Sequence, residues 1–356
     1  MVQKSHKALF IVSLFVIGLM VLALSMAFGS DYPKLVEIFH HIHPEPLIVA
    51  LLCMAVAYLA FTLSFNGLFE MTPHRVPFPR FFSIMFISAT VNFIISSGGM
   101  SSIAIRSLLL KQEKVPYSVT IPLSFAQNMI FNLVLSCVCF GGLVYLRQNP
   151  LFLAGPRQTA IAAFMIILLV VVVTMLLTFF NTVFRRWFLR QILRMGNWVN
   201  LRILRRNPDN RKLVEIRNNL ETTIQFVHRG GIVPLLVVLF WVAMDWLFTA
   251  LCLFYCFRAV GISLSMGLLL VGFTIFFLTS NFNPVPAGLG ISESLLAFIF
   301  KGLGVGFESS LVASILFRFV FFLIPLAVST ALYLDIIRSF LKNQGKAEIK
   351  PNPPTS

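Results

Sequence analysis

Long apolar segments separated by short basic linkers recur along the whole chain. Six of these segments reach about 20 residues or more, which is the length that an α-helix needs to cross the hydrocarbon core of a bilayer. We expect the first of them to be a retained anchor rather than a cleaved signal peptide, because its apolar run is long. The predicted spans are Ala8–Phe28, Leu47–Phe69, Ser118–Tyr145, Ala160–Phe184, Ile232–Phe257 and Ser309–Ile337.

Two further apolar regions, Phe81–Leu110 and Ser263–Gly304, are interrupted by polar, glycine and proline residues. The first is broken at Ser96–Gly99 and the second at Asn283–Gly290. Glycine weakens a helix and proline removes a backbone donor, so each helix should end there. The freed backbone groups cannot face lipid. Each region is therefore predicted to be a helical hairpin that enters the membrane and returns to the same side.

Composition restricts the class of protein. Hydrophobic residues make up 58% of the chain and charged residues 12%, against roughly 45–50% and 25% in soluble domains. This excludes a soluble enzyme, a secreted disulfide scaffold and a disordered chain, and it predicts an all-α polytopic membrane protein. The five cysteines fall inside apolar segments and are expected to be buried packing thiols. No metal site and no cofactor are predicted.

The basic residues predict an orientation. Twenty-two Lys and Arg residues fall on one side of the predicted spans and five on the other, which places the richer side in the cytoplasm. Both termini should then be cytoplasmic, in a bacterial-type cytoplasmic (inner) membrane. Eleven of these residues lie in the interfacial segment 185–229. The net charge of +15 thus reflects membrane topology, and no nucleic-acid partner is expected.

The same orientation predicts an inverted repeat within a single membrane domain, residues 1–337. Each half, about 47–146 and about 232–337, has two spans that flank one hairpin, and the two halves run in opposite directions. The sequence Thr90-Val91-Asn92-Phe93 with Gly99 matches Thr279-Ser280-Asn281-Phe282 with Gly288 at identical spacing. Inverted repeats with broken helices are a recurrent transporter architecture. Residues 338–356 are predicted to form a cytoplasmic tail.

Four ionisable residues lie within apolar sequence: Arg106, Asp245, Glu293 and Arg318. Charges at this depth are costly and usually face a partner or a wet cavity. In one interpretation, Glu293 and Arg318 form a structural pair. In the other, Arg106 or Arg318 binds a lipid phosphate or another anion, for which the planar guanidinium is well suited.

The helix breaks also allow two interpretations. They either permit tight helix packing, or they present backbone N–H groups to an anionic ligand. The second interpretation makes the residues of both breaks candidates for substrate binding. These candidates are Asn92, Gly98, Gly99, Asn283, Pro284, Pro286, Gly288 and Gly290.

The run from Asn283 to Glu293 resembles the P-x-P-G-G-L-G-x-x-E element of the flippase-like transmembrane family found in lysylphosphatidylglycerol synthases, with Ala287 in place of one glycine. Asn92–Gly99 with Arg106 is similar to an earlier motif of that family, with serine where proline is common. Arg318 and the span that carries Trp241 and Asp245 also fit. The resemblance covers about residues 10–337. It implies a membrane module that moves lipids between leaflets.

Three functions are compatible with the sequence. The first is a transporter of phospholipids or other anionic lipids, with a homo-oligomer or a lipid-modifying enzyme as further candidate partners. The second is a membrane enzyme or subunit of lipid modification or glycosylation. No catalytic motif stands out, however, and the expected tail leaves no room for a soluble synthase domain, so we do not expect an enzyme. The third is an ion channel or solute carrier.

Overall fold

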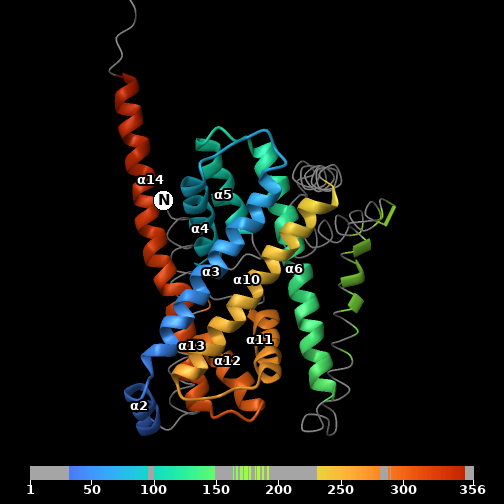
Figure 1. Cartoon of the computed structure of the whole chain (residues 1–356), viewed down its shortest axis with the longest axis vertical. Coiled ribbons are helices and arrows are strands. Elements are labelled where there is room, and N and C mark those ends of the chain that lie inside the picture. The colour runs from blue at the N-terminus through green and yellow to red at the C-terminus, as the bar shows by residue number, and fades with distance from the viewer. Residues whose placement is uncertain are drawn as a thin grey trace, which may run out of the picture.

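A computed structural model describes residues 32–94, 100–148, 231–280, 288 and 290–348, together with isolated residues between 163 and 191 (Figure 1). Every regular element within these ranges is a helix, as the composition predicts. The expected span 8–28 and about half of the expected span 160–184 lie outside the described residues, as does nearly all of the basic segment 185–229.

Four helical stretches in the described part of the chain are long and apolar enough to cross a membrane. They coincide with four of the six predicted spans. The short helix α2 (Tyr32–His40) precedes the first of them. The last stretch is continuous through three elements and extends to residue 348, so the predicted tail begins as helix. The long helices are α3 (Pro44–Phe69), α6 (Tyr117–Gln148), α10 (Ile232–Ala259) and the continuous helix formed by α13 (Phe307–Arg318), η3 (Phe319–Leu323) and α14 (Ile324–Glu348).

The two interrupted apolar regions each fold as a pair of shorter helices, broken where the sequence predicts. The first pair is α4 (Phe78–Ile94) and α5 (Met100–Gln112), and the second is α11 (Met266–Ser280) and α12 (Ile291–Gly302). At a rise of 1.5 Å per residue these helices are about 18–26 Å long, shorter than a bilayer core of about 30 Å. The helices of each pair pack against one another. Figure 1 places α4 and α5 toward one end of the molecule and α11 and α12 toward the other.

Helices α3 and α10 lie side by side through the centre of the molecule and share the largest contact among the described helices (Figure 1). Small buried side chains such as Ala50, Ala57 and Cys256 occupy this region. A methyl group added to Gly67 would lie 3.2 Å from Val238 across the contact. Small residues allow the two backbones to approach closely, which is how membrane helices gain packing energy.

The cysteines confirm most of one prediction. Four of them are buried, and none of the five forms a disulfide. Cys137 is exposed instead, which corrects the expectation of a buried thiol. It lies on α6, part of whose surface faces outward from the helix bundle, and a thiol is apolar enough for that position.

Proline accounts for the π-helix η3 in the last span. Pro325 has no N–H, and its ring clashes with the carbonyl of the residue four positions earlier, which is Phe321. The helix widens at this point, so that the N–H of Ile324 donates to the carbonyl of Phe319. The hydroxyl of Tyr58 on α3 donates to the carbonyl of Phe321 at 3.3 Å. A side chain from a neighbouring helix thus satisfies an acceptor beside the irregularity.

Candidate functional site

A cavity of about 300 Å³ lies between the helices and is lined by residues from α3 to α6 and from α10 to η3. All four ionisable residues that the sequence singles out line this cavity: Arg106, Asp245, Glu293 and Arg318. Asn92 and Gly288 line it as well, whereas Gly290 is not among its lining residues. Gly98, Gly99, Asn283, Pro284 and Pro286 lie outside the described residues.

Arg106, on α5, is 2% exposed and is held by neutral side chains. Its Nη1 donates to Oε1 of Gln127 at 2.7 Å and lies 3.4 Å from the hydroxyl of Ser124. Nη2 donates to the hydroxyl of Ser102 at 3.2 Å, and Nε reaches that of Ser88 at 3.4 Å. In these contacts, the positive charge of Arg106 is therefore stabilised only by the dipoles of neutral hydroxyl and amide groups. The twenty-two basic residues that predict the cytoplasmic side include Arg106, and its burial reduces that count to twenty-one against five.

The position of Gln127 is itself fixed by two hydrogen bonds. Its Nε2 donates to the hydroxyl of Ser64 at 2.7 Å and to the carbonyl of Phe61 at 3.0 Å, so its oxygen must point toward Arg106. The guanidinium also lies over the ring of Phe65, 4.3 Å from its centroid. In the part of the chain that the structure describes, no carboxylate lies within ion-pair distance of Arg106. This arginine is therefore a positive charge without an acidic partner.

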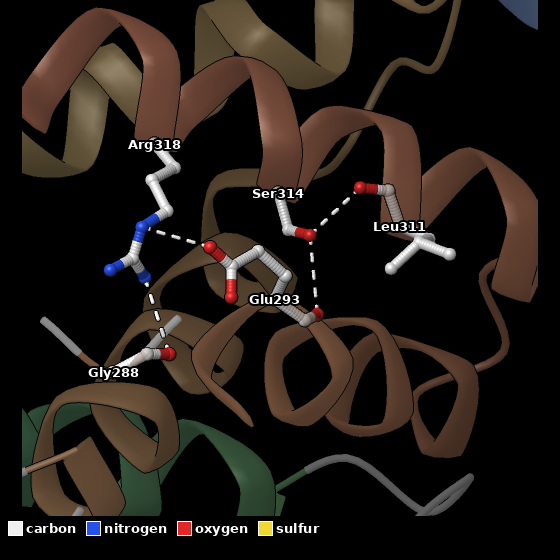
Figure 2. A network of polar contacts seen from close by, with 5 residues as sticks. All are labelled: Gly288, Glu293, Leu311, Ser314 and Arg318. Carbon is white, nitrogen blue, oxygen red and sulfur yellow. Dashed lines mark hydrogen bonds and ion pairs between the residues drawn. The ribbon is translucent and has the colours of Figure 1, made fainter. Parts of the chain in front are cut away.

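Arg318, at the end of α13, has an acidic partner (Figure 2). Its Nε lies 2.8 Å from Oε1 of Glu293, and its Nη1 donates to the carbonyl of Gly288 at 3.4 Å. Ser314, one turn earlier, donates to the backbone carbonyl of Glu293 at 3.2 Å. The interpretation of Glu293 and Arg318 as a buried pair is thus confirmed, and anion binding by Arg318 stays a prediction.

The second helix break positions this pair. Gly288 and Gly290 have φ angles of 62° and 81°, a left-handed region that favours glycine. The two glycines lead the chain into α12, and Glu293 falls in the first turn of that helix. A carboxylate there interacts favourably with the positive end of the helix dipole. The glycine-rich run therefore brings both a backbone carbonyl and a carboxylate to Arg318.

Asp245, on α10, lines the same cavity and is 6% exposed. The hydroxyl of Thr249 donates to the backbone carbonyl of Asp245, not to its carboxylate. Across the described residues, the carboxylate of Asp245 forms no ion pair. The cavity thus contains one arginine without an acid and one acid without a base.

Aromatic rings form much of the remaining wall. The ring of Trp246 lies 4.8 Å from that of Phe131 and 5.0 Å from that of Phe277, measured between centroids. Its indole N–H donates to the carbonyl of Phe131 at 3.3 Å. Trp246 rather than Trp241 lines the cavity, so the tryptophan that the resemblance singled out is not the one at the site. The wall thus combines aromatic rings with polar side chains.

Sequence reasoning missed the polar residues of α6. Ser124, Gln127, Asn128 and Asn132 line the cavity, although α6 is otherwise an apolar span. Their spacing of three or four residues places them along one face of a helix. A polar stripe on a membrane helix indicates a face turned toward a polar interior, and this signal could have identified them.

Comparison with known proteins assigns the membrane region to a family. Residues 10–329 match the family model described as the lysylphosphatidylglycerol synthase TM region. A comparison with curated proteins finds no match. The match includes every ionisable residue of the cavity.

Proposed function

Because the chain belongs to the lysylphosphatidylglycerol synthase transmembrane family, we propose that it moves a phospholipid or another anionic lipid between the leaflets of the cytoplasmic membrane. The observation that carries this proposal is the cavity, in which Arg106 has no acidic partner among the described residues. A buried cation of this kind is costly unless it meets an anion during function. We propose a transporter without catalytic activity of its own.

The headgroup phosphate would be bound by the two arginines. A guanidinium presents parallel N–H groups that match two oxygens of a phosphate. Arg106 lines the cavity, and its guanidinium is held there by Ser and Gln side chains. Arg318 would exchange Glu293 for the phosphate. Apolar rings around Trp246 would accommodate the less polar part of the headgroup region.

Alternating access would follow from an inverted repeat, and the packing of the helices supports one. Helix α3 corresponds to α10, α4 to α11, α5 to α12, and α6 to α13 with its continuation. Under this exchange, the contact of α5 with α6 corresponds to that of α12 with α13, and the contact of α3 with α6 to that of α10 with α13. The contact of α6 with α11 corresponds to that of α14 with α4. Related halves of this kind can exchange conformations.

The turn that follows each hairpin gives a second line of support. Lys114 and Gly304 have φ angles of 63° and 89°, and each lies between a hairpin and the next span. The following residues, Val115 and Val305, both donate to the carbonyl five residues earlier at 3.0 Å. Each residue of the second turn follows its counterpart by 190 positions. The same backbone turn thus follows both hairpins at equivalent positions, and it also ends α10, where Ile262 donates to the carbonyl of Phe257 at 3.0 Å.

The side chains around these turns correspond as well. The ammonium of Lys111 lies 4.8 Å from the ring centroid of Tyr117, and that of Lys301 lies 5.3 Å from that of Phe307. These pairs are again separated by 190 positions. With the corrected charge count, the proposed arrangement has cytoplasmic termini and hairpins that open toward opposite faces.

Replacing the arginines tests the function. We expect Arg106→Gln and Arg318→Gln to reduce transport of fluorescent phosphatidylglycerol in proteoliposomes by roughly tenfold to a hundredfold each, because a hydrogen bond to a charged group is worth about 1.5–3 kcal/mol. Bleaching of the outer leaflet by a membrane-impermeant reductant measures the rate.

Glu308→Gln is the matched control. Glu308 lies 3.9 Å from Lys34, is not among the cavity-lining residues, and its replacement should leave transport unchanged. Wild-type rates in both monodisperse arginine variants would refute the proposed mechanism.

A further inference from the structure

The cavity is lined by equal numbers of positive and negative side chains, but only one positive and one negative side chain form an ion pair. Two arginines and two carboxylates line it, so the fully ionised cavity has no net charge. Glu293 and Arg318 form the only ion pair among these four groups in the described structure. Arg106 and Asp245 each lack a partner of opposite charge within ion-pair distance. An anionic headgroup that entered this ionised cavity would leave one uncompensated negative charge.

Among the described residues, the surroundings of Asp245 offer no group that would remove that negative charge. The titratable groups that line the cavity from other helices are Tyr58 of α3, Arg106 of α5, Glu293 of α12 and Arg318 of α13. The hydroxyl of Tyr58 already donates to a backbone carbonyl. Helices α6 and α11 contribute amides, hydroxyls and rings to the lining. Cys53 and Cys252 are buried thiols on α3 and α10, outside the lining.

We infer that Asp245 takes up a proton when an anionic headgroup occupies the cavity, so that one proton crosses the membrane with each anionic lipid. This inference rests on the proposed function and adds its coupling ion. With Asp245 protonated, the two arginines and Glu293 give the cavity a net charge of +1, which matches the single negative charge of a phosphodiester. The loaded cavity is then neutral, and a neutral assembly is the least costly one to hold within the hydrocarbon region.

The cycle balances without any covalent step. A proton from the aqueous phase on the loading side binds a carboxylate oxygen of Asp245 as the headgroup enters. On the opposite side the headgroup leaves, the carboxylate ionises again, and the proton passes to water. The emptied cavity returns with all four groups ionised and with no net charge.

The pH dependence of transport tests the inference. In proteoliposomes that contain phosphatidylglycerol, the wild-type rate should fall as pH rises, by about tenfold per pH unit above the titration midpoint of a single group. Asp245→Asn cannot release a proton, so its rate should not change with pH. The control Glu308→Gln should keep the wild-type profile. A pH profile that persists in Asp245→Asn would overturn the inference.

A second measurement needs no cavity variant. Transport of one proton with one anionic lipid moves no net charge, so a potassium diffusion potential set with valinomycin should leave the wild-type rate unchanged. A luminal pH dye should report one proton per lipid. A rate that follows the potential and ignores pH would overturn proton coupling but leave the lipid transporter intact. Absence of phosphatidylglycerol movement at every pH would overturn both proposals.

Discussion

At the scale of single residues, the two arginines of the cavity differ in the charge that they leave available. Arg318 is paired with Glu293 at 2.8 Å, whereas Arg106 is held by Gln127 and serine hydroxyls. A buried charge with only neutral partners gives little stability in return for its desolvation. We therefore propose that Arg106 binds the ligand. Because Gln127 is neutral, it holds the guanidinium without neutralising its charge.

Giving Arg106 an acidic partner should impair function without unfolding the protein. Gln127→Glu places a carboxylate oxygen where the amide oxygen now lies 2.7 Å from the guanidinium. The second carboxylate oxygen takes the place of Nε2, 2.7 Å from the hydroxyl of Ser64, which can donate either to it or to the carbonyl of Phe61. We expect transport of phosphatidylglycerol to fall by about tenfold or more, since a charge-assisted contact to the lipid is lost.

The melting temperature of Gln127→Glu in detergent should fall less than that of Gln127→Leu, because the new ion pair with Arg106 offsets part of the lost hydrogen bonding. Gln127→Leu provides the comparison, because it leaves Arg106 without its shortest hydrogen bond and should lower the melting temperature. Undiminished transport by Gln127→Glu would argue that Arg106 does not contact the lipid.

At the scale of helices, glycines decide how closely α11 approaches its neighbours. A methyl group on Gly267 would meet the ring of Tyr145 on α6 at 2.0 Å, and one on Gly272 would meet the ring of Phe300 on α12 at 2.3 Å. Both distances are far below van der Waals contact. Glycines on two faces of α11 thus allow it to pack closely against both α6 and α12, as in other tightly packed membrane helices. This packing fixes the second hairpin, which carries Glu293 on α12.

Filling one of these contacts should destabilise the hairpin. The ring of Phe300 is fully buried and lies 4.5 Å from that of Phe257, so it has no room to yield to a new methyl group. Gly272→Ala should cost about 1–3 kcal/mol through overpacking, seen as a lower thermal unfolding temperature in detergent.

A double-mutant comparison identifies the cause. Phe300→Leu should recover part of the loss when combined with Gly272→Ala, because the two positions are in contact. Gly302→Ala is the control, since its added methyl group would meet no atom within 4 Å. Equal destabilisation by both alanine substitutions would point to an effect other than the close contact.

At the scale of the whole molecule, the sequence predicts the helices and the buried charges but not the contacts between helices. Apolar length predicted four spans that the structure describes, and the glycine and proline runs predicted where the hairpin helices end. Four ionisable residues were predicted to be functional because charges within apolar sequence are costly, and all four line one cavity. The pairing of Glu293 with Arg318, and the absence of an acid beside Arg106, depend on helix contacts far apart in the chain. Local patterns carry no information about these contacts.

The proposed inverted arrangement makes a topological prediction about two lysines. Lys111 and Lys301 are exposed and occupy equivalent positions in the two turns. If the halves are inverted, these turns lie at opposite faces of the membrane. In a variant whose five native cysteines are replaced by alanine, Lys111→Cys should react with a membrane-impermeant thiol reagent only from the cytoplasmic face, and Lys301→Cys only from the outside. Reaction of both cysteines from the same face would refute the inverted repeat, and with it the alternation of access that the lipid transporter requires.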